Sequence, residues 1–401
     1  MIRIGLIKER KIPADNRVAF TPAQCKWIQK NYKDVKICIE KADSRCYADN
    51  EYKKAGLEVS DDLSHCDLLF GIKEVPPEDL IPNKTYLFFS HTRKKQAYNR
   101  KLLQTILSKN ITLIDYECME HTDGQRIIGF GFFAGIVGAH NGMMVYGERT
   151  GSFRLERVYK QKDFKNLIHT YFGLKVPNIK IAVTGSGRVA HGILEIMNLM
   201  GIIEVEKEEY VSRHFDYPVY VQLKGADLYM HKQLRSYNRD HFHLHAQEYE
   251  SLFSQYIPHT DILMNGVYWD VNIPRLFSLK EVSEPYFNLL VIADITDDTN
   301  GSVPINFGDQ SIVDPVYGVD RKTFKKTAPY LPGSVDIIAV GNLPNELPRD
   351  ASKYFGEQLL KYILPDMLGG GSDIIEGATI TKNGKLTVKF SYLSDYVNGR
   401  S

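Results

Sequence analysis

Short apolar runs alternate with amphipathic stretches through the first third of the chain. The stretches have helical spacing and helix start signals, such as Thr21-Pro22, where Thr caps the helix and Pro takes the first helical position. The apolar runs have the length of buried strands and lie at Ile2–Ile7, Val35–Ile39, Leu68–Ile72, Tyr86–Phe89 and Ile111–Asp115. This alternation predicts an α/β lobe with a mainly parallel sheet.

A second series of strands and helices begins near Asn178. Its strands are expected at Ile179–Thr184, Ile202–Glu206, Ile262–Asn265 and Leu289–Asp294. Between the two series, residues 129–147 mix small and apolar side chains, which suits a helix packed closely against another backbone. Later signals favour a helix at Leu347–Ile363 and a β-hairpin around Asn383-Gly384.

The chain is too long for one compact core. Single cores stop growing at roughly 250 to 300 residues, and a chain of 401 residues suits two domains. We therefore predict an α/β protein of two Rossmann-like lobes with parallel sheets flanking a central cleft. Residues 1–130 plus about 315–401 are expected to form a substrate or catalytic domain, and residues 131–314 a dinucleotide-binding domain.

Charge and cysteine content narrow the range of partners. Lys and Arg total 50 against 49 for Asp and Glu, so no net field recruits nucleic acid or an anionic membrane, and small-molecule partners are expected. The five cysteines are widely spaced without a Cys-x-x-Cys pair, which indicates reduced thiols. The N-terminal sequence lacks a targeting pattern, and no apolar run is long enough to span a bilayer. A cytoplasmic location is the expectation, and the oligomeric state, a homo-oligomer included, stays open.

A glycine-rich turn marks the expected nucleotide site. The strand ending at Thr184 runs into Gly185-Ser186-Gly187-Arg188-Val189 and then into a helical stretch. Residues without a Cβ let the backbone approach a pyrophosphate, and the helix N-terminus supplies N–H groups and a partial positive charge. An NAD or NADP cofactor is therefore expected, with a purely structural turn as the alternative.

Glu206 bears on the choice between the two cofactors. An acid at the end of the second strand accepts hydrogen bonds from the adenosine ribose and repels a 2′-phosphate, so Glu206 slightly favours NAD. Lys207 and Arg213 lie close by in sequence and could neutralise a phosphate instead. Glu206 could equally be an exposed strand-end acid, so the sequence does not resolve NAD from NADP.

Four stretches, in order around the glycine turn, carry a family resemblance. They are Lys8–Pro22 with its Arg-x-Ala-x-Thr-Pro core; Gly71–Glu74 with Phe88–Lys94; Leu113–Met119 with Gly129–Gly135; and Met264–Asp270, Ile273–Leu276, Ala293–Asp298 and Asn342–Ala351. Together they resemble the lysine-forming saccharopine dehydrogenases and, more closely, the lysine-ketoglutarate reductase domain, both relatives of alanine dehydrogenase. The resemblance implies an NAD(P)-dependent oxidoreductase that interconverts saccharopine with L-lysine and 2-oxoglutarate.

The resemblance assigns acid–base catalysis to Lys73 and His91. Condensing an amine with a ketone and reducing the imine moves protons on nitrogen and on oxygen. A desolvated lysine beside a histidine can supply two groups with separable pKa values for this work. Without the resemblance, Lys73 would be interpreted as a surface lysine and His91 as a core histidine.

The same resemblance implies four substrate-binding residues. Arg17 suits a planar, two-pronged grip on a substrate carboxylate. Lys94 is a second candidate for this work, with an exposed lysine as the alternative. Glu74 and Glu117 are expected to hold amino groups, although Glu117 could instead be a helix-cap acid.

Further cofactor contacts are implied in the second lobe. Asp294 ends an apolar strand, where ligands of open α/β sheets bind, and it is expected to face the nicotinamide side of the cleft. The other expected contacts are Asn265, Gly266, Tyr268, Asn342, Leu343 and Pro344. Asn-Gly and Leu-Pro are also common turn sequences, so these assignments are looser.

Three histidines, His241, His243 and His245, invite comparison with a metal site. Their i, i+2 spacing suits one face of a strand, whereas residues 237–256 look helical. We therefore expect no metal.

Three rival functions stay open on sequence alone. An alanine-dehydrogenase-like or transhydrogenase-like enzyme would share Arg17, Lys73 and the glycine turn. A dehydrogenase for another opine-type secondary amine is the second rival. A non-enzymatic nucleotide-binding regulator is the third, and the presence of residues competent for proton transfer at both positions disfavours it.

Overall fold

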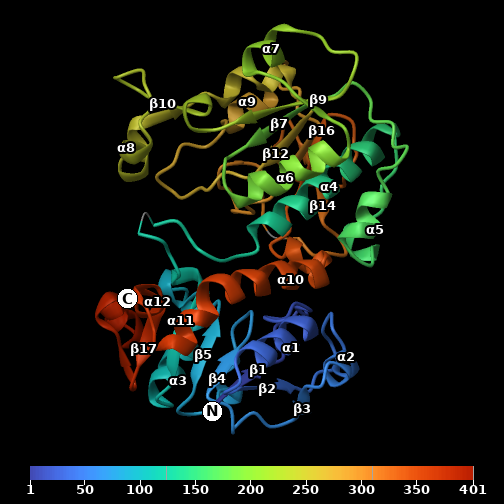
Figure 1. The fold of residues 1–401 in the computed structure, drawn as a ribbon. Coiled ribbons are helices and arrows are strands. Elements are labelled where there is room, and N and C mark those ends of the chain that lie inside the picture. Colours follow the sequence, from blue (N-terminus) through green and yellow to red (C-terminus); the bar gives the residue numbers. More distant parts are fainter. Residues whose placement is uncertain (123, 309, 401) are drawn as a thin grey trace. The chain divides into compact units, whose positions relative to one another are not determined.

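The computed structural model describes residues 1–122, 124–308 and 310–400. The chain forms two compact units: unit 1 holds Met1–Phe130 and the chain from Pro348 onward, and unit 2 holds Gly131–Leu347. Each unit is built on one eight-stranded sheet in which parallel pairs dominate (Figure 1). The predicted α/β class is confirmed.

The sheet of unit 1 contains the strands predicted in the first third of the chain. Its order is β18-β17-β6-β5-β4-β1-β2-β3. The strands are β1 (Ile2–Leu6), β2 (Val35–Glu40), β3 (Glu58–Ser60), β4 (Leu68–Phe70), β5 (Thr85–Phe88), β6 (Thr112–Asp115), β17 (Thr379–Lys382) and β18 (Lys385–Leu386). The first six strands pair in parallel, and β17 and β18 form the predicted hairpin, antiparallel to β6. The segments that follow β4, β5 and β6 therefore meet at one edge of the sheet.

Among the described residues, unit 1 contains seven α-helices. They are α1 (Pro22–Asn31), α2 (Asp49–Lys54), α3 (Arg100–Ser108), α10 (Pro348–Gln358), α11 (Leu364–Gly369), α12 (Asp373–Ala378) and α13 (Ser394–Val397). α1 begins as predicted: the Thr21 hydroxyl accepts from the Gln24 N–H at 3.3 Å, and the Gln24 side chain accepts from the Thr21 N–H at 2.9 Å. This reciprocal capping fixes where the chain enters the helix.

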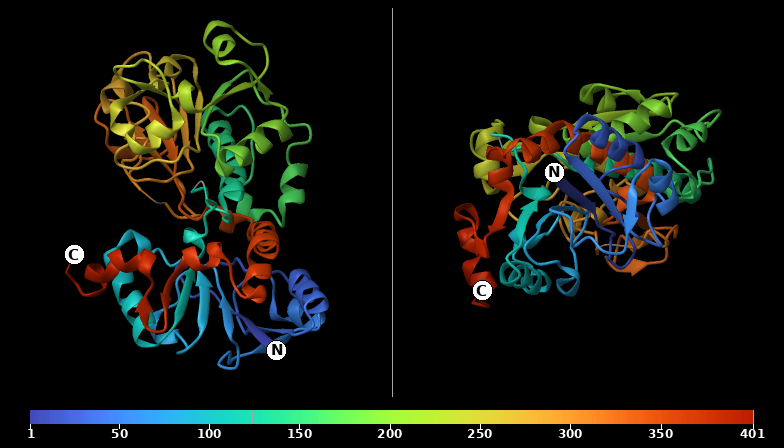
Figure 2. Two further views of the ribbon diagram at one scale, coloured as in Figure 1. Left: turned by 60° about the vertical axis from the view of Figure 1, so that its left-hand side comes forward. Right: turned by 60° about the horizontal axis from the view of Figure 1, so that its bottom comes forward.

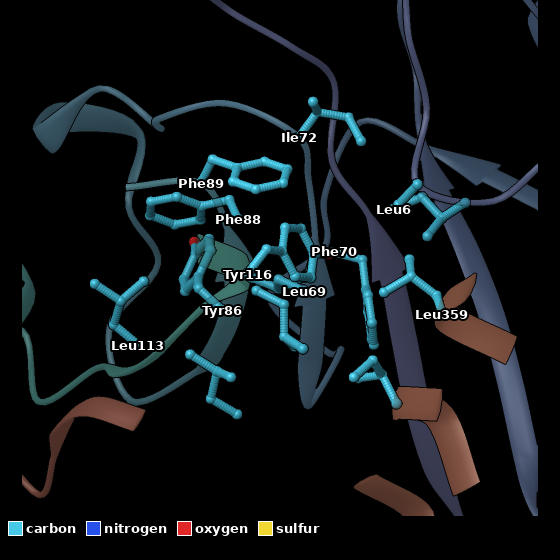
Figure 3. Packing of buried hydrophobic residues seen from close by; sticks show 14 of the residues in the cluster. Leu6, Leu69, Phe70, Ile72, Tyr86, Phe88, Phe89, Leu113, Tyr116 and Leu359 are labelled. Carbon is cyan, nitrogen blue, oxygen red and sulfur yellow. The ribbon is translucent and has the colours of Figure 1, made fainter. Parts of the chain in front are cut away.

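The core of unit 1 packs against the middle of its sheet. Phe70 on β4 meets Phe20 with ring centroids 5.4 Å apart, and Tyr116 meets Phe89 and Phe355 at 5.2 Å each. Figure 3 shows further buried members of this cluster, including Leu6, Leu69, Tyr86 and Phe88. Each fully buried side chain of this size contributes about 1.5 to 3 kcal/mol, so the core holds the strand ends in fixed positions.

The sheet of unit 2 reaches further along the chain than predicted. Its order is β15-β14-β16-β13-β12-β7-β9-β8. The strands are β7 (Lys180–Thr184), β8 (Ile203–Glu204), β9 (Val219–Leu223), β12 (Ile262–Asn265), β13 (Val291–Asp294), β14 (Val316–Asp320), β15 (Lys326–Thr327) and β16 (Ser334–Ile338). β16 pairs in parallel with β13, and β14 pairs antiparallel with β16. The expected return of the chain near residue 315 is therefore wrong, because these strands extend the second sheet and unit 1 resumes only at Pro348.

Two helices of unit 2 touch backbone to backbone. Among its described residues, this unit has the α-helices α4 (Gly131–Thr150), α5 (Phe164–His169), α6 (Arg188–Leu199), α7 (Lys207–Ser212), α8 (Arg239–Leu244) and α9 (Leu279–Ser283). A Cβ on Gly135 of α4 would lie 2.0 Å from the Val189 carbonyl oxygen, and a Cβ on Gly192 of α6 would lie 2.0 Å from the Phe132 carbonyl oxygen. This confirms the close packing predicted from the small residues, and Figures 1 and 2 show the two helices side by side. Neither α4 nor any other helix among the described residues is long and apolar enough to cross a membrane.

The segment predicted as helical at residues 237–256 folds differently. Only α8 is an α-helix there, and β10 (Tyr229–His231) and β11 (Tyr249–Ser251) form a separate two-stranded sheet. Tyr229 stacks on Phe242 with ring centroids 4.6 Å apart. Aromatic packing of the two strands against a short helix buries Tyr229, Phe242 and Tyr249 while most of the segment stays at least partly exposed, which periodicity along one element does not reveal.

Candidate active site

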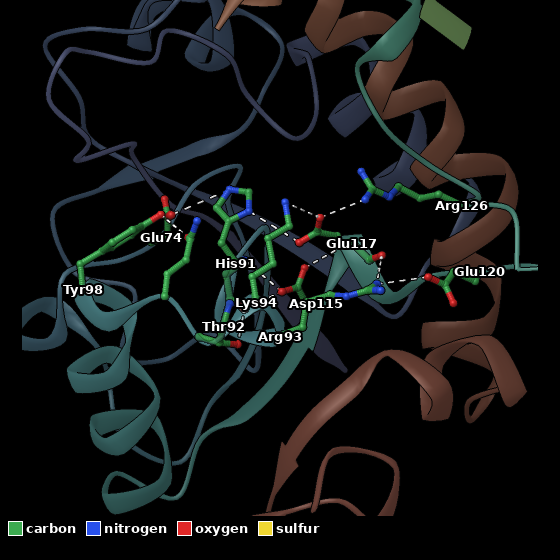
Figure 4. Close-up of polar contacts among 12 residues, drawn as sticks. Glu74, His91, Thr92, Arg93, Lys94, Tyr98, Asp115, Glu117, Glu120 and Arg126 are labelled. Carbon is green, nitrogen blue, oxygen red and sulfur yellow. Dashed lines mark hydrogen bonds and ion pairs between the residues drawn. The ribbon is translucent and has the colours of Figure 1, made fainter. Parts of the chain in front are cut away.

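His91 lies in the segment that follows β5, between two carboxylates (Figure 4). Glu74 Oε1 is 3.8 Å from its Nε2, and Glu117 Oε2 is 3.6 Å from its Nδ1. The backbone of His91 is left-handed, with φ 53°, a conformation that few non-glycine residues adopt and that often marks functional positions. The ring stacks on Phe89 with centroids 6.5 Å apart. His91 is therefore held between the segments that follow β4 and β6.

The Glu117 carboxylate lies close to His91 and to two cationic side chains. Its Oε1 lies 3.3 Å from Lys94 Nζ and 3.0 Å from the Arg126 guanidinium. Burial alone would raise the pKa of Glu117, but His91, Lys94 and Arg126 together hold that pKa at about 2. Glu117 therefore stays ionised at neutral pH and acts as a fixed negative charge.

Two carboxylate oxygens in this group have unused capacity to accept hydrogen bonds. Among the described residues, the buried Oε1 of Glu74 and Oε2 of Glu117 receive no hydrogen bond. Both face His91 at distances longer than a hydrogen bond. Because buried polar atoms are normally paired, these oxygens mark positions for N–H groups of a ligand.

Lys73 follows β4, and its backbone is held by the carboxyl group of the partly buried Glu9. Glu9 accepts hydrogen bonds from two successive backbone N–H groups, the second being that of Lys73 at 2.8 Å. Burial and the nearby Arg17 lower the pKa of Lys73 to about 8, against the opposing effect of Asp15. Burial and Asp15 raise the pKa of Glu9 to about 8. Lys73 is thus a lysine that gains and loses its proton near neutrality.

Arg17 is not the open carboxylate grip that the sequence suggested. Its side chain is 3% exposed, and Asp15 accepts from its Nε at 2.9 Å and from a terminal nitrogen. The guanidinium also lies over the Phe130 ring, 4.2 Å from the centroid. Arg17 is therefore engaged within the fold. Arg126, whose side chain is 42% exposed, is a more accessible cation that the sequence interpretation did not select.

Asp115 connects the two segments that carry His91 and Glu117. This carboxylate is fully buried and accepts from the Ser90 N–H at 3.1 Å and from the Glu117 N–H at 2.8 Å. It fixes the spacing of the His91–Glu117 pair. The sequence indicates only that Asp115 ends a strand. Its hydrogen-bond partners become apparent only from the pairing of β5 with β6.

The glycine turn of unit 2 has the geometry of a nucleotide loop. Gly185 has φ +102°, and a Cβ there would lie 2.7 Å from the Gly266 carbonyl oxygen, so only glycine fits. α6 follows at once with Gly187 as its N-cap, and both Ser186 and Gly187 are exposed. The first N–H groups of this twelve-residue helix, from Arg188 and Val189 on, have no intrahelical acceptors and therefore suit a phosphate.

Glu206 is misplaced by the sequence interpretation. The strand beside β7 is β9, and β8 pairs with β9 at the sheet edge. Glu206 is exposed and caps α7 beyond that edge strand. Leu223 ends β9, so Lys224 takes the position next to the glycine turn that was expected for an acid.

Asn265 and Asp294 hold strand ends together and do not present open side chains. Both are buried, and Asn265 Nδ2 donates to Asp294 Oδ1 at 2.8 Å. Asn265 also accepts from the Thr184 hydroxyl at 2.7 Å, and Asp294 accepts from Asn306 at 2.8 Å. Their expected direct contacts with a cofactor are thus replaced by a network that ties β7, β12 and β13 together.

A cavity of about 240 Å³ opens beyond the ends of β13 and β16. It is lined by Ala134, Ile295, Thr296, Asp297, Val340, Gly341, Leu343 and Pro344. Leu343 and Pro344 were predicted from the sequence, and the Thr296-Asp297 side of the cavity was missed. Asn342 adjoins it in sequence, whereas Tyr268 is 73% exposed and is not among the lining residues.

Similarity to characterised proteins extends along the chain. A family model described as "Alanine dehydrogenase/PNT, N-terminal domain" matches residues 5–137. The mitochondrial alpha-aminoadipic semialdehyde synthase of Mus musculus is 30% identical over 94% of this chain and 46% of that protein, so the chain spans about half the length of this relative. The saccharopine dehydrogenase [NAD(+), L-lysine-forming] of Emericella nidulans is 26% identical over 90% of this chain and 91% of that protein.

Solved structures show the same fold. An L-alanine dehydrogenase superposes with a TM-score of 0.66 at 16% identity, covering 100% of both chains. The transhydrogenase from Sinorhizobium meliloti gives a TM-score of 0.58 at 15% identity, covering 96% of this chain and 98% of that chain.

Proposed function

We propose that this chain, a homologue of the alpha-aminoadipic semialdehyde synthases and the L-lysine-forming saccharopine dehydrogenases, interconverts saccharopine with L-lysine and 2-oxoglutarate. In the oxidative direction, saccharopine, NAD(P)⁺ and water give L-lysine, 2-oxoglutarate, NAD(P)H and a proton. The observation that carries the proposal is the pair of buried, unsatisfied carboxylate oxygens flanking His91. Such oxygens accept hydrogen bonds from amino groups, and lysine brings two amino groups.

The proton transfers of the reaction are assigned to Lys73 and His91. Lys73, with a pKa of about 8, accepts a proton from the secondary amine or from the attacking water when it is neutral. His91, fixed between Glu74 and Glu117, is the second group and returns a proton to the departing lysine nitrogen. Two groups in separate electrostatic surroundings suit the paired proton transfers of imine formation and hydrolysis.

The two cations that contact Glu117, Lys94 and Arg126, are suited to bind the carboxylates of the substrate. The side chains of Lys94 and Arg126 are 54% and 42% exposed while they contact Glu117. A carboxylate that approaches them adds a second charge-assisted hydrogen bond to each. Saccharopine carries three carboxylates, so more than one cation is needed.

A nicotinamide cofactor fits unit 2 by the shape of its glycine turn. The exposed Ser186 and Gly187 leave the backbone open ahead of α6, and a Cβ at Gly187 would meet nothing within 4 Å. The pyrophosphate would rest on the N–H groups from Arg188 onward, and the cavity at Leu343 and Pro344 would take the nicotinamide end. When bound, the cofactor accepts or supplies the hydride.

We favour NADP(H) over NAD(H). The residue after β9 is the exposed Lys224, and a cation there suits a 2′-phosphate. The nearest acid in sequence, Asp227, is occupied: it accepts from the Lys224 N–H at 3.3 Å and pairs with Lys207. The carboxylate that would select a ribose hydroxyl is thus neutralised by its own neighbours.

Lys224→Ala is expected to lower kcat/KM for NADPH about tenfold and to leave kcat/KM for NADH nearly unchanged. A hydrogen bond to a charged group contributes about 1.5 to 3 kcal/mol, enough for that factor. Initial rates with each cofactor measure the ratio. Lys232→Ala, an exposed lysine in the same unit, is the control and should change neither value. Equal losses with both cofactors would contradict a role at the phosphate.

The proposed reaction itself is tested by supplying substrates singly and together. The purified protein should oxidise NAD(P)H when L-lysine and 2-oxoglutarate are both present and not with either alone. An alanine-dehydrogenase-like enzyme would instead turn over with pyruvate and ammonia. Turnover with that pair and none with lysine and 2-oxoglutarate would overturn the proposal.

A further inference from the structure

A second cluster of ligand-type side chains lies in unit 1, away from His91. One ligand atom from each of Cys38, Glu58 and His65 lies within 4.8 Å of the other two. Cys38 on β2 is paired with Glu58 on β3, so the two side chains leave the sheet on the same side. His65 comes from the segment between β3 and β4. Three separate stretches of chain thus bring sulfur, oxygen and nitrogen together.

Gly5 allows this segment to pack down onto Cys38. Gly5 is paired with Cys38 in the neighbouring strand β1, and Figure 1 shows β1, β2 and β3 in one sheet. A Cβ on Gly5 would lie 2.6 Å from Leu69 and 3.3 Å from the Cβ of Cys66. The missing Cβ at Gly5 leaves room for Cys66 beside Cys38.

The proton on Cys38 is held in place by its surroundings. The thiol is 3% exposed, and burial followed by the charge of Glu58 raises the pKa of Cys38 to about 11. A divalent cation reverses this balance, because it neutralises both the thiolate and the carboxylate.

We propose that Cys38, Glu58 and His65 bind one zinc-type divalent cation through sulfur, oxygen and nitrogen. Zinc takes this ligand set with bonds of roughly 2.0 to 2.3 Å, which places tetrahedral ligand atoms roughly 3.5 Å apart. The atoms of the cluster lie within 4.8 Å of one another, so they move closer together when the cation binds. The cation replaces the thiol proton of Cys38, which passes to solvent, and no electron is transferred. The site ties the edge strand β3 and the residue 61–67 segment to β2.

The other cluster with suitable residue types does not carry a site. It consists of His231, His241 and Glu248. His231 Nδ1 accepts from two backbone N–H groups at 3.1 Å each, so the ring proton is on Nε2, facing Glu248 at 3.1 Å. To ligate a metal through Nε2, the ring would have to move its proton to Nδ1, which faces two backbone N–H donors.

The test uses Co²⁺ alone as a spectroscopic probe on the chelator-treated, dialysed full chain. One equivalent should bind with a sulfur-to-cobalt charge-transfer band, release protons and be displaced by Zn²⁺. Cys38→Ser should abolish the band, and Cys46→Ser, a half-buried cysteine of the same unit outside the cluster, should retain it. Glu58→Gln and His65→Ala, which remove an exposed and a half-buried ligand, should each weaken Co²⁺ binding about 10- to 100-fold.

Thermal unfolding gives an independent reading. Zn²⁺ should raise the unfolding midpoint of the wild type and of Cys46→Ser, and should raise that of His65→Ala much less. The absence of stoichiometric Co²⁺ binding, a band that survives Cys38→Ser, or wild-type affinity in both Glu58→Gln and His65→Ala would overturn the proposal. Because Glu58 and His65 lie outside the core, their variants decide the question even if Cys38→Ser fails to fold.

Discussion

Replacing Lys73 with methionine is expected to lower kcat for saccharopine oxidation by about 100- to 10,000-fold, the usual contribution of one general acid–base group. Methionine has a similar length but holds no proton. Cofactor binding should survive, because the glycine turn belongs to unit 2 and Lys73 to unit 1. Stopped-flow rates and cofactor titration by fluorescence measure the two effects separately.

The direction in which the oxidation rate changes with pH also tests the role of Lys73. Lys73 accepts a proton only when neutral, and its pKa is about 8, so the wild-type oxidation rate should rise as pH increases through about 8. This limb of the pH profile, the rise of the rate through about pH 8, should be absent in Lys73→Met. Lys95→Met is the control, since Lys95 lies in the nearby basic run with its ammonium 5.5 Å from the Tyr392 ring centroid, and it should keep both the rate and the limb. An unchanged limb in Lys73→Met would remove Lys73 from the acid–base assignment.

Gly192→Ala is expected to destabilise unit 2 by about 3 kcal/mol, at the upper end of overpacking effects. The added Cβ would meet the Phe132 carbonyl oxygen at 2.0 Å and the Ile136 nitrogen at 2.8 Å. These are backbone atoms of α4, so no side chain can rotate away and the two helices must separate. For a unit of this size the midpoint of thermal unfolding should fall by about 6 to 12 °C, as calorimetry would show.

Gly187→Ala is the matched control for Gly192→Ala. Both glycines belong to the same glycine-rich stretch, but an added Cβ at Gly187 meets nothing within 4 Å. Its unfolding midpoint should therefore match the wild type. Equal midpoints for the two variants would contradict the close helix packing on which the nucleotide turn is built.

The strand pattern was readable from sequence where strands are buried. β1, β2, β4, β5 and β6 coincide with apolar runs because both faces of a parallel sheet are covered. β9 was not predicted, and the strand at β8 was placed beside the glycine turn, because strand order depends on pairing that periodicity does not show: β9 lies between β7 and β8, which is a two-residue, exposed edge strand. Pairing between strands distant in sequence also decided that residues 316–338 belong to unit 2.

The main residues of the candidate site could be selected from the sequence, but the partners that position them could not. His91, Glu74, Lys94 and Glu117 were selected from sequence and come together in unit 1. Their supporting partners were not selected, because Glu9 and Asp115 act through backbone N–H groups of other segments. The pairing of the Arg17 guanidinium with Asp15 likewise depends on local folding, which residue type alone does not specify.

The most direct test of the central claim is the fate of the transferred hydride. The protein is incubated with L-lysine, 2-oxoglutarate and NADPH carrying deuterium at the transferable position, and the products are analysed by mass spectrometry. The proposed function predicts saccharopine containing one deuterium, on the carbon that joins the glutarate moiety to the secondary amine. Absence of deuterated saccharopine, together with deuterated alanine when pyruvate and ammonia are supplied, would contradict it.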